Sequence, residues 1–371
     1  MDENSACLCF SLSDGIGPKT FIRLLKHFGS AKNAWKDLDS ANFKHAGISE
    51  NLYKKFDSFR KTFDLNEYLE KLNKTKVTVI SYTSDKYPEL LKQLQSPPII
   101  LFCKGNLELL NSTTNIGVVG ARKITSYGKD VTEKLVSELV AYDFTIISGL
   151  AFGVDATAHK TALENNGKTI AVLGCGVDCC TPAENQDLYE KILDHGGLII
   201  SEYPLGQPPS AGSFPARNRI IAGLSLGVLI TEAAEDSGSL ITAEEARKLG
   251  RPVFAVPGSI NSQMSKGALK LIRNGAILVQ SSKDILETFE VKMQNGFTAS
   301  RAKGKITSQK LKGLNTKEKQ IVQLVENEAI SLDLISKQTK IPTVKLMVLV
   351  SSLEMRGILE NKNGEVKLKE S

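Results

Sequence analysis

Four short loops rich in glycine, hydroxyl and cationic residues could bind phosphate groups. They are 120–123 (GARK), 148–155 (SGLAFGVD), 174–176 (GCG) and 231–239 (TEAAEDSGS). Glycine lets the backbone approach a ligand closely, hydroxyls and free N–H groups donate to phosphate oxygens, and Arg122 supplies a planar positive group. One such loop is weak evidence, because glycine after a strand is often only a tight turn. Their repetition predicts a phosphate-binding site.

A second cluster combines an aromatic ring, two arginines and an amide. It consists of Phe214, Arg217, Asn218 and Arg219. The ring can stack on a base, the guanidinium groups can contact phosphates, and the amide can bond a base edge. This combination suits unpaired nucleic acid. In the alternative interpretation the ring is a core anchor and the arginines pair with Glu202 or Glu232.

No pattern typical of catalysis or of a metal site is found. His159 follows Asp155 by four positions, but no nucleophile lies near it in the sequence, so a structural or pocket-lining role is favoured. The cysteines at 175, 179 and 180 lack paired CxxC spacing and are interpreted as free thiols. There is no Walker A loop and no dinucleotide-binding fingerprint. We expect a protein that is not an enzyme and has no metal or cofactor.

The elements that must position these loops form a sheet. Short apolar runs separated by amphipathic helices over residues 74–290 predict a Rossmann-like, doubly wound, mostly parallel sheet. The predicted strands are 77–80, 99–102, 116–119, 145–147, 170–173, 198–200, 228–230, 253–256 and 276–279. In such a sheet, ligands bind outside the carboxyl ends of the strands, which is where the four loops lie.

The flanking regions have other patterns. Residues 1–72 predict a small all-α domain of the helix-hairpin-helix (SAM-like) type, with Gly-containing turns at 14–18 and 46–48 that either contact a phosphate or serve only packing. Residues 291–313 predict a basic flexible linker. Residues 314–371 predict a winged helix, with helices at 316–326, 332–338 and 342–356 and a hairpin about 361–364. The third helix is so apolar that protein interaction or packing is favoured over base readout.

Charge and compartment give further expectations. Residues 291–320 hold eight Lys and Arg against one acidic residue, a local charge of +7, whereas the rest of the chain has 39 basic and 40 acidic residues. This stretch is either a solvated spacer or an electrostatic tether for phosphates. The first residues lack a signal peptide pattern, and no apolar run reaches membrane-spanning length. We therefore expect a cytoplasmic protein.

Three stretches together resemble the DNA-processing protein A (DprA, or Smf) family. They are 148–159 (SGLAFGVDATAH), 214–225 (FPARNRIIAGLS) and 237–258 (SGSLITAEEARKLGRPVFAVPG). The resemblance covers about residues 110–290 and fits a three-part architecture. It implies a homodimer that coats single-stranded DNA taken up in natural transformation, cooperates with or displaces single-strand-binding protein, and loads RecA.

On matching positions, the resemblance implies a DNA pocket at Arg122, at 214–219 and at 238–239. Together with the strand-end loops it predicts the full set of DNA contacts. These are Gly120, Arg122, Lys123, Ser148, Gly149, Gly153, Lys160, Phe214, Arg217, Asn218, Arg219, Gly238, Ser239 and Lys266. We expect loss of Arg122 or Arg217 to weaken DNA binding and to leave the melting temperature nearly unchanged.

Two other functions remain open. One is a Rossmann-like nucleotide phosphoribohydrolase, in which Glu232 beside the 231–239 loop would act in catalysis, although the loop lacks that enzyme's PGGxGTxxE pattern. The other is a sequence-specific regulator that binds duplex DNA through residues 314–371.

Overall fold

The computed structural model describes residues 1–37, 39–294, 316–325, 330–339, 341–355, 358–362 and 365–368. The chain divides into two compact units, Met1–Asn295 and Gly296–Ser371. Of the predicted linker, residues 291–294 belong instead to the end of helix α14 (Ser282–Gln294), and residues 295–313 lie outside the described residues. The predicted boundary between the helical domain, which ends at residue 72, and the sheet domain, which begins at residue 74, remains a prediction.

The first 74 residues form helices, as predicted. These are α1 (Glu3–Leu12), α2 (Pro18–Phe28), α3 (Ala31–Asp37), α4 (Ser40–His45), α5 (Glu50–Thr62) and α6 (Leu65–Lys74). Side-chain caps start several of them: Asp2, Asp39, Ser49 and Asp64 each accept a backbone N–H of the helix that follows. Phe10 joins the helices by stacking on Phe56 at 5.3 Å between ring centroids.

The two predicted turns between these helices lie close together. Gly15 and Gly47 both have positive φ, and Gly17 caps α2 ahead of Pro18. The Arg23 guanidinium on α2 donates to the Gly47 carbonyl at 3.1 Å. Arg23 therefore connects the turn at 46–48 to α2, the helix that follows the turn at 14–18. This contact gives the two turns a packing role.

The large sheet has nine strands in the order β1-β2-β6-β5-β4-β3-β7-β8-β9. Their bounds are β1 Thr78–Ser81, β2 Ile100–Gly105, β3 Asn115–Val119, β4 Thr145–Ser148, β5 Thr169–Val172, β6 Leu198–Ser201, β7 Gly227–Ile230, β8 Val253–Ala255 and β9 Ile277–Leu278. From β6 to β9 all neighbours are parallel. The first two strands depart from the parallel pattern, because β1 and β2 pair antiparallel with each other and β2 pairs antiparallel with β6.

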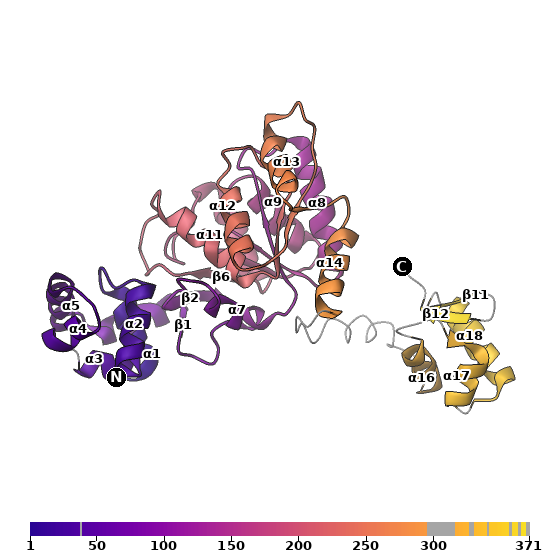
Figure 1. The fold of residues 1–371 in the computed structure, drawn as a ribbon, viewed down its shortest axis with the longest axis horizontal. Helices are drawn as coiled ribbons and strands as arrows, with labels where there is room; N and C mark the ends of the chain where they lie inside the picture. The colour runs from indigo at the N-terminus through magenta and orange to yellow at the C-terminus, as the bar shows by residue number, and fades with distance from the viewer. Residues whose placement is uncertain are drawn as a thin grey trace. The chain divides into compact units, whose positions relative to one another are not determined.

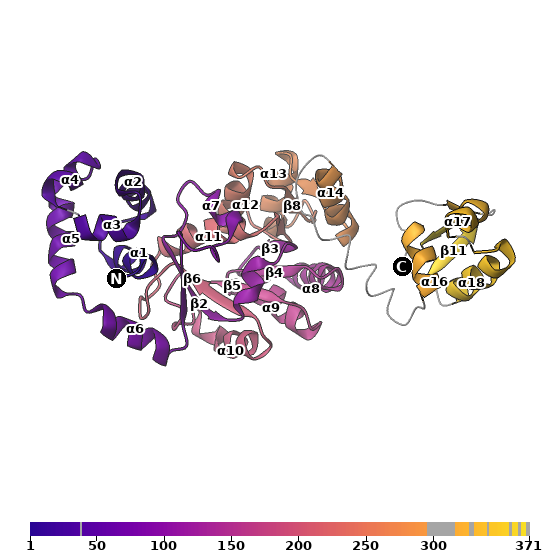
Figure 2. The ribbon, with the colours of Figure 1, turned by 90° about the horizontal axis from the view of Figure 1, so that it is seen from below.

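Helices cover both faces of the sheet (Figure 2). One face carries α8 (Ser126–Ala141), α9 (Val154–Glu164) and α10 (Gln186–Asp194), and the other carries α11 (Ser213–Leu224) and α12 (Ser239–Lys248). Strands β3 to β8 are buried along their whole length for this reason. Each buried Val, Leu or Ile contributes about 1.5–3 kcal/mol of apolar burial.

The chain reverses direction in the sheet between β3 and β7. It builds β3, β4, β5 and β6 outward on one side, then crosses through α11 to place β7 on the other side of β3. Adjacent loops diverge at such a point and leave room for a ligand at the carboxyl ends of the strands. In Figure 1 the N-terminal helices gather beside β1 and β2, at the opposite end of the sheet from β8 and α13 (Lys266–Arg273).

The second unit contains α16 (Thr316–Leu324), β10 (Ile330–Ser331), α17 (Leu332–Thr339), α18 (Thr343–Met355), β11 (Leu359–Lys362) and β12 (Glu365–Leu368). Its three strands pair in the order β10-β12-β11. Leu346, Val350 and Leu353 of α18 lie in its core, whereas Met347 and Val348 are exposed. The helix and hairpin positions agree with the sequence prediction, and the winged-helix assignment stays a prediction.

Among the residues that the structure describes, no helix is both long enough and apolar enough to cross a membrane.

Candidate nucleic-acid interface

The loops that follow β3, β4 and β7 meet at the point where the chain reverses. The Ala121 N–H donates to the Glu232 carbonyl at 2.7 Å, and the Val154 N–H donates to the Ala121 carbonyl at 3.1 Å. Gly120 sits between these partners. The 120–123 turn is therefore held on two sides by backbone hydrogen bonds.

Gly153 makes this close approach possible. Its φ is +74°, and a side chain there would overlap the carbonyl of Ala121 and the backbone of Arg122. The loop around it is held further by the Asn185 amide, which donates to the Leu150 carbonyl at 2.8 Å. The 149–153 loop thus supports the turn that presents Arg122.

Arg122 and Phe214 come together although they lie far apart in the sequence. The guanidinium carbon of Arg122 is 5.5 Å from the centroid of the Phe214 ring, within cation–π range. Arg122 is exposed and Phe214, at the start of α11, is half-buried. The ring lies near Gly174, where an added Cβ would be 3.1 Å from it. A positive group and an aromatic face are therefore both available at this edge, which is what a base and its phosphate require.

Arg217 is placed differently from the sequence expectation. It is buried, and its Nη1 donates to the carbonyls of Gly149, at 2.5 Å, and Val172. Burial lowers the pKa of this arginine, and the nearby Asp155 opposes that shift. The guanidinium therefore connects α11 to the ends of β4 and β5, and its Nε has no hydrogen-bond partner among the residues that the structure describes.

Arg219 is also engaged within the protein. Its two terminal nitrogens donate to the two carboxylate oxygens of Glu202 at 2.8 and 2.6 Å, and both side chains are mostly buried. This is the pairing with Glu202 that the sequence left open as the alternative to phosphate contact.

The structure places the other expected contacts in several environments. Asn218 and Gly238 are joined, since the Asn218 amide donates to the Gly238 carbonyl at 3.2 Å. Ser148 is buried and donates to the Val118 carbonyl. Ser239 is buried beside the Ser237 hydroxyl. Lys160 lies on α9, paired with Glu164 at 3.7 Å, outside the cluster around Arg122.

Two expected lysines are exposed. Lys123 follows Arg122 directly, and Lys266 begins α13. The neighbouring Gly267 N–H donates to the Ala233 carbonyl at 2.8 Å, so Lys266 lies near the loop after β7. Both ammonium groups could contact phosphates.

One residue at this edge was missed by the sequence analysis. Phe152, in the loop held by Gly153, keeps 42% of its surface exposed. A large aromatic residue between glycines in a strand-end loop is the signal that could have identified it. Its exposed ring is a second surface on which a base could stack.

Glu232 has a structural role in this site. One carboxylate oxygen accepts the Thr125 N–H at 2.8 Å, and the other accepts the Thr125 hydroxyl at 2.6 Å. Thr125 in turn caps α8. The carboxylate is buried and neutralises part of the positive end of that helix.

Comparison with known proteins identifies relatives with this architecture. A model of the DNA recombination-mediator protein A family matches residues 78–290, and a model of the DprA-like N-terminal HHH domain matches residues 2–47. Protein Smf of Synechocystis is 41% identical over 287 residues, which are 76% of this chain and 72% of that protein. DNA processing protein DprA of Streptococcus pneumoniae is 47% identical over 211 residues, 57% of this chain and 73% of that protein.

Solved structures show the same relationship. The structure of DprA from S. pneumoniae superposes on this chain with a TM-score of 0.68 and 36% sequence identity. The matched residues are 77% of this chain and 98% of the S. pneumoniae chain. DprA from Helicobacter pylori, whose structure addresses its mode of binding single-stranded DNA, has a TM-score of 0.53 and 32% identity over 58% of this chain and 97% of that chain. The family model spans more than half of the sequence, and the Synechocystis relative is similar across most of both chains. The chain belongs to the DNA recombination-mediator protein A (DprA) family.

Proposed function

We propose that this protein binds single-stranded DNA, without catalysis, at the carboxyl edge of its parallel sheet, and that Arg122 and Phe214 make the central contact. The observation that carries this proposal is the exposed guanidinium 5.5 Å from the aromatic ring. Stacking on a ring and phosphate neutralisation do not depend on base identity, so the binding tolerates any sequence. The H. pylori relative, with its described single-stranded-DNA binding, supports this assignment.

The remaining predicted residues divide by role. Lys123, Asn218 and the glycine-lined backbone at 120, 153 and 238 would contact the strand beside Arg122. Arg217 and Arg219 would position α11 and its Phe214, because both are engaged by protein groups. Lys160 and Lys266 would add charge at the margins. Gly149, Ser148 and Ser239 would shape the loops from within.

The cellular role follows from family membership. The protein would act in DNA processing during transformation, where it protects incoming single strands and loads RecA for homologous recombination. A homodimer in the cytoplasm, working alongside single-strand-binding protein, completes this proposal. Names of relatives that refer to DNA processing support the general role.

The phosphoribohydrolase alternative is not supported. Its relatives do not appear among the matches described above, which are DNA-processing proteins. Glu232, the residue that would act in catalysis, has each carboxylate oxygen bound to Thr125. That geometry suits a helix cap.

The direct test is titration of fluorescent 20-nucleotide oligo-dT with Arg122→Ala, Arg122→Lys and a control, Arg273→Ala. Arg273 is exposed at the C-terminal end of α13. This helix runs from the carboxyl end of β8 back to the start of β9, so Arg273 lies at the amino ends of the strands, away from the proposed site. Losing a charge-assisted contact and its ring partner should weaken binding by about 10- to 100-fold, corresponding to about 1.5–3 kcal/mol. Lysine should restore part of the affinity, because it keeps the charge and loses the planar stacking. Equal affinity of Arg122→Ala and the wild type would contradict the proposal.

A further inference from the structure

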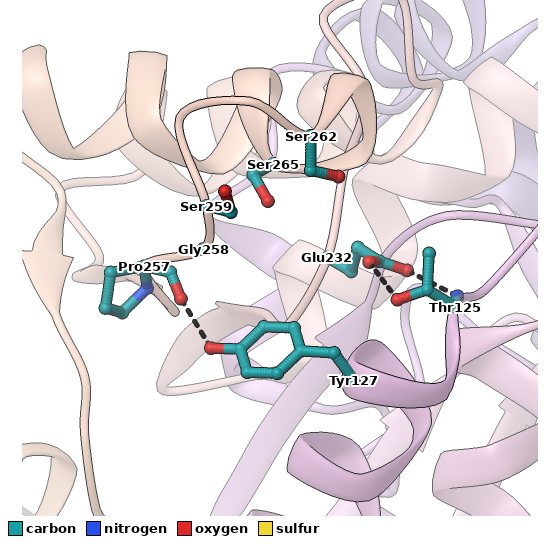
Figure 3. A pocket seen from close by; sticks show the side chains of 8 residues that line it. All are labelled: Thr125, Tyr127, Glu232, Pro257, Gly258, Ser259, Ser262 and Ser265. Carbon is teal, nitrogen blue, oxygen red and sulfur yellow. Dashed lines mark hydrogen bonds between the residues drawn. The ribbon is translucent and has the colours of Figure 1, made fainter.

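A cavity of about 490 Å³ lies next to the proposed DNA edge (Figure 3). Its walls come from the start of α8, the end of β7 and the loop between β8 and α13. The residues that matter are Thr125, Tyr127, Glu232, Ser259, Ser262 and Ser265. None of them belongs to the contacts proposed above. The volume is in the range of pockets that hold small organic ligands.

Ser265 contributes a hydroxyl group to the wall of this cavity. The residue as a whole is only 5% exposed. In Figure 3 the Ser265 side chain points into the cavity. A hydroxyl in this position can donate to or accept from a ligand atom.

The charge of the cavity selects against phosphate. Glu232 already lies at the N-terminal end of α8, which is where a phosphate would bind in such a fold. No lysine or arginine is among the lining residues, all of which the structure describes. A carboxylate oxygen can accept about two hydrogen bonds, so each Glu232 oxygen can still accept one from a ligand. The site therefore favours a neutral ligand that donates hydrogen bonds.

A metal ion is a poor match for the same walls. Only one carboxylate lines the cavity, and the described residues include no group of three or more His, Cys, Asp or Glu side chains able to hold a metal.

Tyr127 adds an aromatic surface held in a fixed position. Its hydroxyl donates to the Pro257 carbonyl at 2.6 Å, which joins α8 to the opposite wall (Figure 3). The side chain is 45% exposed, so part of the ring is free for contact. A flat ligand could stack on this ring and point its donors at Glu232 and the serines.

We propose that this cavity binds a single nucleobase that carries an exocyclic amine. The amine would donate to Glu232, ring acceptors would bond to serine hydroxyls, and Tyr127 would contact the face of the base. Guanine, adenine and cytosine have such an amine and thymine does not. No bond is made or broken.

The base can come from the bound strand or from a free nucleoside. Thr125 is three residues from Arg122, so the two are at most about 11 Å apart along an extended chain. A strand with a phosphate on Arg122 could therefore place a base in the cavity. This source rests on the proposed DNA binding, whereas free nucleoside binding does not.

Calorimetric titration of the full chain tests both sources. The probes are deoxyguanosine, deoxyadenosine, deoxycytidine, thymidine and inorganic phosphate, followed by oligo-dT with or without one central deoxyguanosine. The variants are Ser262→Trp, to fill the cavity, and Ser265→Ala, to remove its hydroxyl. Ser137→Ala, on the exposed side of α8, is the control. Melting curves establish that each variant is folded.

We expect the three amine-bearing nucleosides to bind at least fivefold more tightly than thymidine, and phosphate not to bind. Ser262→Trp should abolish binding and Ser265→Ala should weaken it about fivefold. Wild-type protein that binds none of the nucleosides, or binding that survives Ser262→Trp, overturns the proposal. If the central deoxyguanosine tightens oligonucleotide binding and Ser262→Trp removes the gain, the strand is the source; no gain leaves the free nucleoside as the ligand. Ser262→Trp should bind oligo-dT as tightly as the wild type. Unchanged oligo-dT affinity would show that the variant has lost the base cavity and has kept the proposed DNA-binding site.

Discussion

Arg217 occupies the space directly in front of Gly149. Its Nη1 donates to the Gly149 carbonyl at 2.5 Å, and a methyl group on Gly149 would overlap the guanidinium. The arginine stands three residues after Phe214 on α11, so this contact fixes the helix start against the ends of β4 and β5. The glycine in the SGLAFG loop thus makes room for a buried arginine as well as shaping a turn.

Arg217→Ala should reduce the free energy of unfolding by about 2–4 kcal/mol. The change leaves two buried carbonyls without their donor and opens a cavity. This replaces the sequence expectation that the melting temperature stays unchanged. Urea denaturation measures the effect, and Lys123→Ala, an exposed cation nearby, should lie within about 0.5 kcal/mol of the wild type. A fully stable Arg217→Ala protein with weak DNA binding would instead place this guanidinium on the DNA.

The Glu202–Arg219 pair should show a measurable coupling energy. Its two hydrogen bonds are parallel and its side chains are each 14% exposed. A double-mutant cycle with Glu202→Gln and Arg219→Gln should give about 1–2 kcal/mol. The exposed Lys129–Glu133 pair on α8, at 3.6 Å, is the control and should give less than about 0.5 kcal/mol. Equal coupling in both cycles would mean that Arg219 is free to leave Glu202 for a phosphate.

His159 should make stability depend on pH. Burial, assisted by the charge of Arg217, lowers its pKa from 6.5 to about 3. The Thr169 hydroxyl donates to the Ile146 carbonyl, so it accepts from His159 Nδ1 at 2.7 Å, which places the proton of the neutral ring on Nδ1. The unfolded chain protonates near pH 6.5 and the folded one does not. This stabilising contribution is therefore complete above pH 6.5 and is lost as the pH falls towards 3.

Between pH 7.5 and pH 5 the wild type should lose about 2 kcal/mol more stability than His159→Asn. Denaturant titrations across this range measure the difference, and other groups that titrate contribute to both proteins alike. His195→Asn, which changes an exposed histidine, should keep the wild-type dependence. Parallel curves for the wild type and His159→Asn would show that His159 is protonated in the folded state.

Much of the fold could be predicted because its signals are local. All nine apolar runs of the sheet are strands, and in β3 to β8 the reason is full burial on both faces, which requires continuous apolar side chains such as Val, Ile and Leu. The antiparallel pairing of β1 and β2 could not be read this way. Their composition resembles that of the parallel strands, and their direction depends on how the chain returns to β6.

The candidate site was harder to predict because it depends on distant contacts. Arg122, Arg217 and Arg219 look equivalent as residue types. Only the fold shows that Arg217 faces backbone carbonyls, that Arg219 faces Glu202, and that Arg122 remains exposed beside a ring. Glycine at 149 and 153 indicated a close approach, but the approaching group at Gly149 is a protein side chain.

The salt dependence of DNA binding should separate the proposed contact from the basic stretch. For single-stranded DNA, each neutralised phosphate contributes about −0.7 to the slope of log K against log salt. Arg122→Ala should make the slope shallower by about that amount. A second variant changes Arg301, Lys303, Lys305, Lys310 and Lys312 to Gln, and we expect it to keep the wild-type slope if the stretch is the solvated spacer that the sequence favours. Fluorescence anisotropy from 50 to 300 mM salt measures both. A slope that falls steeply only in the five-glutamine variant would identify this stretch as the phosphate-binding element, and the carboxyl edge of the sheet would then contribute mainly through base stacking.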